Sequence, residues 1–426
     1  MAEVQPLRAL HYDQRVTGPL QGVVAPPYDV IDCAERERLL ARSPYNVVGV
    51  DLPQGDDPYA AADELFEHWR MQGAVVRDSQ PALWVLQQRY TGPEGMSLSR
   101  QGFFARVRVQ EYGAGRIRPH ERTHPGPKED RLRLTRATRA NLSPIFSLYS
   151  DPDGRARKAL DSTTDQSPWG EVTDDDDTTH RLWRLGDAEA IAAVTDALAP
   201  AELLIADGHH RYETARIYAD EIGGEGEHRY VLMCLVALED PGLTVFPTHR
   251  LVRGLDAGRQ QALRDAIRRD FEVTEVSRAE IAPPAAPSGG SDRDGNGPLE
   301  LGYIDSHHRQ AYRLRLRDQA VADRALPDRS DAYRHLDTGV LEALLLKGAL
   351  GFSDDAISHL DGLGYARDTE QALALIDTGT YDAAFLLRPT PVAQVRDVAA
   401  AGESMPPKST YFFPKVLTGM VFNALE

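Results

Sequence analysis

The stretch that decides the fold reads Ile205-Ala206-Asp207-Gly208-His209-His210-Arg211-Tyr212-Glu213-Thr214-Ala215. An apolar run over 202–206 leads into it, which predicts a buried strand. The residues from 212 to 222 predict a helix, and Gly223-Gly224 ends it. Residues 230–238 are again strongly apolar, which is typical of a second buried strand. Strand, tight turn, helix and strand in this order predict a mixed α/β fold, of the α+β type, with mixed sheets and helices.

The pattern continues on both sides of this stretch. Strands are predicted at 102–110 and 144–149, and a helix is predicted from Pro127, a proline at the first helical position followed by acidic residues. Another helix is predicted over 187–198. On the C-terminal side we expect strands at 299–304, 311–316 and 383–387, and helices at 338–350 and 368–377.

Residues 282–297 contain mainly proline, glycine, serine and aspartate without periodicity, which indicates a flexible loop or linker. Around this segment we expect three structured regions. An N-terminal α/β region, 1–150, carries the loop from His120 to Arg131, and a central region, 151–280, carries the turn from Asp207 to Arg211. A linker over 281–298 precedes a C-terminal α/β region, 299–426, which carries Lys408 to Thr410.

The composition excludes several classes of protein. The formal net charge of -17 over 426 residues argues against general nucleic-acid binding, because a phosphate backbone needs a basic field. No run approaches the ~20 apolar residues of a membrane span, so we expect a cytoplasmic protein that does not bind membranes. Its two cysteines cannot form a disulfide framework, and Cys234 lies in an apolar run typical of a buried thiol. Lysines are scarce, which draws attention to Lys128, Lys347, Lys408 and Lys415.

The turn at 207–211 is the first candidate site. The start of a helix presents backbone N–H groups and the positive end of its dipole, and Gly208 permits a sharp turn there. Arg211 offers a planar fork for a phosphate or carboxylate, and His209 and His210 add imidazole donors. Asp207 is a candidate general base. Alternatively, Asp207 caps the helix and the histidines lie on the surface.

A second cluster runs from Arg118 to Arg131. Glu121 is a candidate general base and His120 a candidate substrate contact, while Lys128 and Arg131 could hold phosphate oxygens. The alternative is an exposed charged loop. A metal site built from His120, His124 and the histidines of the turn lacks a diagnostic spacing, so we predict no metal held by protein ligands alone.

The third cluster, from Met405 to Lys415, contains Lys408-Ser409-Thr410. Lysine followed by two hydroxyls resembles the end of a phosphate-binding loop, although the glycine-rich prefix of that loop is absent. A phosphate contact and a structural C-terminal strand are both open interpretations. Near the N-terminus, Tyr28 and Asp29 follow two prolines and are candidate substrate contacts or turn residues.

These segments, in this order, resemble a widespread prokaryotic family of uncharacterised proteins, the domain-of-unknown-function family one-thousand-and-fifteen. The resembling stretches are 25–30, 120–141, 206–215, 247–251 and 383–417, which together span nearly the whole chain.

The turn is also similar to the phosphate-binding turn of the ParB/sulfiredoxin superfamily, which includes free-serine kinases. That likeness implies that His210 and Arg211 contact nucleotide phosphates. It places His209 where sulfiredoxins have a nucleophilic cysteine, which removes sulfinic-acid repair. Direct phosphoryl transfer to a hydroxyl then remains, with Glu121 or Asp207 as base.

The resulting expectation is a small-molecule kinase that uses ATP or ADP and a divalent metal, with Mg²⁺ as the best choice. The expected substrate is a free hydroxy amino acid such as serine. A phosphatase of a phosphorylated metabolite such as phosphoserine uses the same residues, and His209 could then be phosphorylated transiently. A nucleotide-binding regulator without catalysis is the third interpretation.

Overall fold

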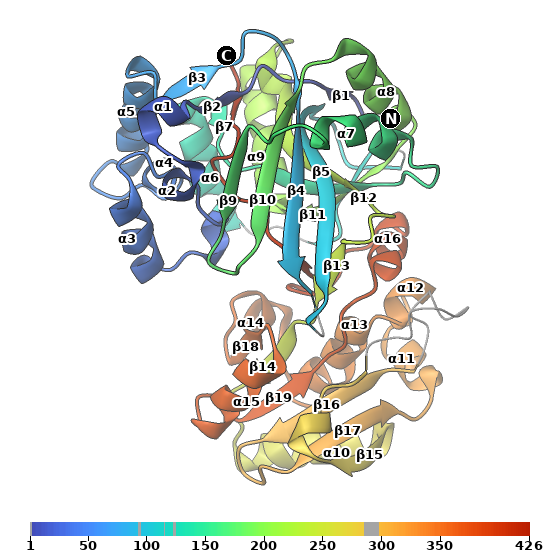
Figure 1. Ribbon diagram of the computed structural model, residues 1–426. Helices are drawn as coiled ribbons and strands as arrows, with labels where there is room; N and C mark the ends of the chain where they lie inside the picture. Colours follow the sequence, from blue (N-terminus) through green and yellow to red (C-terminus); the bar gives the residue numbers. More distant parts are fainter. Residues whose placement is uncertain (1, 93–94, 115, 122–124, 285–297) are drawn as a thin grey trace. The chain divides into compact units, whose positions relative to one another are not determined.

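The structure is a computed structural model that describes residues 2–92, 95–114, 116–121, 125–284 and 298–426. Contacts within the chain divide it into two compact units (Figure 1). The first unit contains Met1–Pro119, Thr123–Thr244 and Pro414–Glu426. The second unit contains His120–Arg122 and Val245–Phe413.

A nine-stranded mixed sheet forms the centre of the first unit. The pairs β6–β11 and β8–β12 are parallel, and the other pairs of the sheet are antiparallel. In spatial order the strands are β6 (Ile117–Arg118), β11 (Leu203–Asp207), β8 (Ile145–Tyr149), β12 (Tyr230–Ala237), β5 (Ser97–Arg108), β4 (Leu83–Thr91), β10 (Thr179–Leu185) and β9 (Gly170–Thr173), with β1 (Val4–Gln5) beside β5. Two short ladders join β2 (Leu10–Tyr12) to β3 (Val75–Arg77) and β7 (Ala140–Asn141) to β21 (Asn423–Ala424).

Three helices, α7 (Arg155–Thr164), α8 (Ala188–Leu198) and α9 (His209–Ile222), share one continuous apolar core with this sheet. Tyr212 and Ala215 of α9 pack into that core beside strand residues such as Ile205 and Met233. The helices are α1 (Gln14–Thr17), α2 (Leu20–Val23), α3 (Cys33–Arg42), α4 (Val48–Asp51), α5 (Pro58–Met71), α6 (Pro125–Thr138), α7 (Arg155–Thr164), α8 (Ala188–Leu198) and α9 (His209–Ile222). A 3₁₀ turn at Tyr28–Val30 and another at Glu227–Arg229 complete the unit.

The second unit is built on a six-stranded antiparallel sheet. Its spatial order is β15 (Phe271–Val276), β17 (Ala311–Leu316), β16 (Glu300–Asp305), β19 (Ala383–Leu386), β14 (His249–Val252) and β18 (Leu363–Ala366). Two apolar clusters draw on alternate residues of these strands, as a sheet covered on both faces requires.

The remaining elements of the second unit are α10 (Ala257–Asp270), η4 (Arg278–Glu280), α11 (Gln319–Ala325), α12 (Asp331–Arg334), α13 (Asp337–Leu341), a π-helix (Glu342–Lys347), α14 (Asp354–Ser358), α15 (Thr369–Asp377) and α16 (Val392–Ala400). A two-stranded ladder joins β13 (Thr244–Phe246) to β20 (Tyr411–Phe413). The π-helix falls within the helix predicted over 338–350. Periodicity alone does not distinguish such a π-helical turn from an α-helix.

The predicted mixed α and β fold is confirmed, and the predicted strands and helices correspond to observed elements. The units do not follow the regions expected at 1–150 and 151–280. The reason is that β4, β5 and β8 pair with β10, β11 and β12, which lie on the other side of residue 150. Most of the expected linker, residues 285–297, lies outside the described residues.

Cys234 is fully buried on β12, as expected, and burial raises the pKa of its thiol to about 12. Cys33 is exposed. Within the described part of the chain, no helix is both long enough and apolar enough to cross a bilayer.

Candidate functional site

The predicted turn joins β11 directly to α9. β11 ends at Asp207, Gly208 is the N-cap with φ 96° and ψ 29°, and α9 begins at His209. Asp207 is therefore not the cap, contrary to the alternative interpretation. A glycine cap has no side chain to bind the N–H groups of the first helical turn, which face outward from the helix start. His209 is buried and His210 is half-buried.

The side chain of Arg211 folds back across Gly208. A Cβ atom on Gly208 would lie 2.9 Å from Nε of Arg211 and 3.0 Å from its Cζ, so only glycine leaves room for this arrangement. One Nη of Arg211 donates to Oγ of Ser143 at 2.9 Å and to the carbonyl of Pro144. The other lies 3.2 Å from Oδ2 of Asp207.

Arg211 is nine-tenths buried, with 10% of its side chain exposed. Its Nε is buried and has no hydrogen-bond partner among the described residues. Leaving a donor of a charged group unsatisfied is costly, commonly more than about 1–3 kcal/mol. This donor is therefore a candidate contact for a bound anion.

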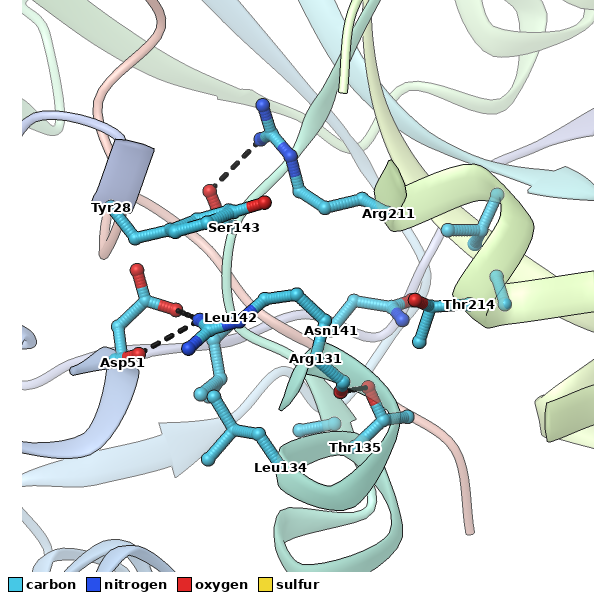
Figure 2. Close-up of a pocket in the computed structure, with 13 residues that line it drawn as sticks. Tyr28, Asp51, Arg131, Leu134, Thr135, Asn141, Leu142, Ser143, Arg211 and Thr214 are labelled. Atoms are coloured by element: carbon cyan, nitrogen blue, oxygen red, sulfur yellow. Dashed lines mark hydrogen bonds and ion pairs between the residues drawn. The ribbon is translucent and has the colours of Figure 1, made fainter. Parts of the chain in front are cut away.

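Arg211 lines a cavity together with Tyr28, Asp51, Arg131 and Ser143 (Figure 2). The cavity lies between α6 and α9, and Asn141 and Thr214 also line it. Its volume is about 40 Å³, enough for a few water molecules or one phosphate-sized group, and it is open to solvent on one side.

Arg131 and Asp51 form a buried ion pair on one wall of the cavity. One Nη of Arg131 lies 3.0 Å from Oδ1 of Asp51 and donates to its carbonyl at 2.8 Å. The Arg131 guanidinium also stacks 4.3 Å from the centre of the Tyr28 ring. Burial raises the pKa of Asp51 and raises that of Tyr28 to about 12, so Tyr28 stays neutral at physiological pH. Asp51 offsets the charge of Arg131. The pair therefore forms part of the cavity wall and does not present an uncompensated cation to a ligand.

Two further lysines belong to this region of the first unit. Nζ of Lys415 lies 3.6 Å from Oδ2 of Asp207, and its side chain is 15% exposed. Lys128, near the start of α6, is half-buried, and its carbonyl accepts a hydrogen bond from Oγ1 of Thr214 at 3.5 Å. Asp29 is exposed on the 3₁₀ turn that carries Tyr28.

The other predicted residues lie together in the second unit. His120 is 1% exposed, and its Nε2 lies 2.9 Å from Oγ1 of Thr410. Glu121 forms an isolated β-bridge with Met405, and its Oε1 accepts the backbone N–H of Lys408 at 3.3 Å. The structure thus joins the start of the second cluster to the third cluster.

Ser409 does not present its hydroxyl to solvent. The residue is buried, and its Oγ donates to the carbonyl of Pro406 at 2.7 Å and lies 2.9 Å from Oγ1 of Thr338. Thr390 also donates to the carbonyl of Ser409 at 2.9 Å. These contacts suit a residue that holds the 405–410 segment better than one that binds a phosphate.

The sequence-predicted residues therefore fall into two groups, one in each unit. The first unit holds Tyr28, Asp29, Lys128, Arg131, Asp207, Gly208, His209, His210 and Arg211, and the second holds His120, Glu121, Lys408, Ser409 and Thr410. That the two groups form one site stays a prediction. The burial of His120 and Arg131 is at odds with the alternative of a solvated loop, and His124 lies outside the described residues.

Sequence reasoning missed Asp51 and Ser143. Neither belongs to a polar cluster: Asp51 ends a short helix of valines, and Ser143 precedes a proline between apolar residues. An isolated polar residue in apolar surroundings is a weak signal, although a buried aspartate in such a segment does call for a cationic partner.

Comparison with solved structures gives distant likenesses. A conserved hypothetical protein from Pyrococcus furiosus is 15% identical with a TM-score of 0.34, covering 70% of this chain and 86% of that one. A free serine kinase in complex with AMP is 14% identical with a TM-score of 0.33, covering 70% and 83%. SbnI from Staphylococcus aureus, with a C-terminal truncation, is 11% identical with a TM-score of 0.35, covering 74% and 85%.

No curated protein matches the sequence. The family described as "Protein of unknown function (DUF1015)" matches residues 4–338, well over half of the chain. The resemblance expected from the sequence is thereby confirmed, and the chain belongs to this family.

Proposed function

We propose that the β11–α9 turn binds a nucleotide phosphate and that the protein transfers a phosphoryl group between ATP or ADP and a small metabolite. The observation that carries this proposal is the guanidinium of Arg211, which is nine-tenths buried and lies beside a polar cavity. Its Nε is buried and has no hydrogen-bond partner among the described residues. Beside a polar cavity, such a donor can be completed by an acceptor atom of a bound ligand.

The charges around the turn favour an anion. Arg211 and Lys415 both lie within 4 Å of one carboxylate, Asp207, so two cations gather at the turn. Arg131 and Asp51 balance each other on the opposite wall. The start of α9 adds the positive end of a 14-residue helix, capped by a glycine. The cavity has room for one phosphate group, so the rest of a nucleotide would extend outside it.

Phosphoryl transfer requires little covalent chemistry from the protein. A substrate hydroxyl attacks the terminal phosphorus, the nucleotide leaves with one phosphate fewer, and the hydroxyl proton passes to a carboxylate. Asp207 is the candidate base in the same unit as Arg211, and Glu121 is the candidate in the second unit. His209 is 5% exposed, which suits a packed residue better than a phosphorylated one.

A divalent metal completes the proposal. Among the described residues no group of three or more histidine, cysteine or acidic side chains could hold a metal ion. Mg²⁺ usually binds through one or two carboxylates, water and substrate phosphates, so such a cage is not required. Serine as substrate follows from the sequence likeness to free-serine kinases alone.

Calorimetric titration with ADP, ATP and inorganic phosphate tests the phosphate site. Arg211→Met keeps the bulk of the side chain and removes its donors, and we expect it to weaken ADP binding about 10- to 150-fold. Arg216→Met is the matched control: it lies on the same helix, pairs with Glu213 at 3.4 Å and does not line the cavity. Equal losses in the two variants would contradict the assignment.

A transfer assay separates the three activities that fit the site. Purified protein with Mg²⁺ and ATP or ADP is offered serine, other hydroxy amino acids and phosphorylated metabolites, and products are measured by mass spectrometry. Phosphoserine formation from serine supports the kinase. Phosphate release from phosphoserine without nucleotide supports the phosphatase. Tight ADP binding without turnover of any compound supports a regulator and overturns the catalytic proposal.

A further inference from the structure

A fully buried arginine contacts the main chain beside Lys415, the lysine near the proposed phosphate site. Arg100 of β5 is 1% exposed, and its guanidinium stacks 4.6 Å from the centre of the Phe146 ring. Its Nε donates to Oε1 of Gln88, on the neighbouring strand β4, at 3.0 Å. Its Nη2 donates to the carbonyl of Pro414. Burial lowers the pKa of Arg100 to about 10, so the guanidinium stays charged in the core at neutral pH.

Gln88 continues the contact to the next carbonyl of the chain. Its Oε1 accepts from Arg100, so its amide Nε2 is the donor, and it donates to the carbonyl of Lys415 at 2.9 Å. The same Nε2 lies 3.2 Å from Nδ1 of His180, which therefore accepts. Nε2 of His180 then carries the proton and donates to Oδ2 of Asp174 at 2.8 Å. The four side chains form one hydrogen-bonded chain with consistent donors and acceptors.

This chain fixes two consecutive carbonyls, those of Pro414 and Lys415. Placing a charged guanidinium in a core is unfavourable, so the hydrogen bonds of Arg100 to this segment call for a reason. The fixed main chain sets where the lysine side chain starts, and from there Nζ of Lys415 reaches Oδ2 of Asp207 at 3.6 Å.

We propose that Lys415 is the second cation of the phosphate site and that Arg100 and Gln88 are positioning residues that hold it there. The phosphate contact of Lys415 rests on the function proposed above, whereas its positioning does not. Lys415 supplies a point charge beside the fork of Arg211, a combination that suits a phosphoryl group with several oxygens.

Chemical labelling tests the positioning without any ligand. The protein is treated briefly with a lysine-acylating reagent, and modification of Lys415 is measured by mass spectrometry relative to the exposed Lys158. We expect Arg100→Met and Gln88→Met to raise the labelling rate of Lys415 several-fold. Arg106→Met, on the same strand and paired with Glu227, is the control and leaves it unchanged. Unchanged labelling in both test variants, with folding verified by circular dichroism, would overturn the positioning role.

A double-mutant cycle on ADP affinity tests the link to the site. We expect Lys415→Met to weaken binding about tenfold, and Gln88→Met to weaken it by a similar factor when Lys415 is present. In the Lys415→Met background, Gln88→Met should have no further effect, because it acts through the lysine. Additive losses would contradict that route. If the wild type binds neither ADP nor phosphate, the proposed function fails, while the labelling result still decides the positioning.

Discussion

Each unit buries an arginine against the main chain of the same C-terminal segment, next to one of its lysines. In the first unit Arg100 donates to the carbonyl of Pro414, before Lys415. In the second unit Arg250, also buried, donates to the carbonyls of Pro407 and Lys408 at 3.0 and 3.1 Å. The Arg250 guanidinium stacks 4.6 Å from the centre of the Tyr365 ring, much as Arg100 stacks on Phe146.

The two arrangements differ in what they fix. In the first unit the ammonium of Lys415 reaches a carboxylate of the candidate site. In the second unit the contact is made by the backbone N–H of Lys408 with Glu121, while the lysine itself is exposed with φ 55°. A buried arginine thus positions the charged side chain of Lys415 in the first unit and the main chain at Lys408 in the second unit. Sequence alone gives both lysines equal weight.

The largest effect expected from this comparison concerns the two carboxylates. Asp207→Asn keeps the shape of the side chain but cannot take a proton, so turnover should fall about 100- to 10,000-fold. ADP binding should stay equal or tighten, because a negative charge beside Arg211 and Lys415 is removed. Glu121→Gln should lower turnover much less, since an amide oxygen still accepts the Lys408 N–H. Steady-state kinetics and calorimetry measure both, and the reverse order would place the base in the second unit.

A second contrast, of intermediate size, lies between two buried histidines. Both ring nitrogens of His180 have partners, whereas Nε2 of His249 is buried without one among the described residues. Burial lowers the pKa of His249 to about 4, against about 6.5 when unfolded. Its folded pKa is depressed, so its contribution to stability is full above pH ~6.5 and is lost as the pH falls toward 4, about 3 kcal/mol in total.

Denaturant unfolding at a series of pH values measures this dependence. His249→Gln should flatten the fall in unfolding free energy between pH 6.5 and 4, relative to the wild type. A variant with the same slope as the wild type would show that His249 is not the titrating group. His180→Gln is the comparison variant. Burial also lowers the pKa of His180, but both of its ring nitrogens have partners.

The smallest predicted effect tests the path of Arg211 over the turn. Gly208→Ala places a Cβ against the guanidinium and should weaken ADP binding about tenfold. Gly223→Ala is its matched control at the other end of α9, where φ is also positive at 69° but no atom lies within 4 Å of the added Cβ. Both variants should lose stability, as differential scanning calorimetry can show. Loss of ADP affinity in both alike would mean that backbone strain, and not the displaced Arg211, is responsible.

Much of the fold was predictable because period and burial are local signals. The apolar strand, the glycine and the helix around 203–222 lie next to each other in the sequence, so the turn and its polar residues were found together. The helix begins at His209 rather than at 212, because two histidines and an arginine give no apolar period. The pairing of Glu121 with the 405–410 segment is seen only in the structure. A β-bridge between residues nearly three hundred positions apart leaves no local pattern in the sequence.

The residues that support the site were not predictable for the same reason. Ser143 lies between two strands, whereas Gln88 and Arg100 lie within strands beside other polar residues. Each acquires its role from a partner 12 to 327 residues away. A polar residue at an inward strand position can only be recognised as paired once the sheet order is known. Asp51 and Arg131 form their ion pair across 80 residues in the same way.

The central claim, that a phosphate binds at the start of α9, is tested most directly by the backbone amides of that turn. Protein labelled with ¹⁵N-histidine reports the N–H groups of His209 and His210 in a heteronuclear spectrum. Titration with ADP and with inorganic phosphate should shift both resonances, with the dissociation constant found by calorimetry, and adenosine should leave them unmoved. Arg211→Met should abolish the phosphate response. If ADP binds while these two amides do not shift, or if adenosine shifts them equally, the phosphate is not at this turn.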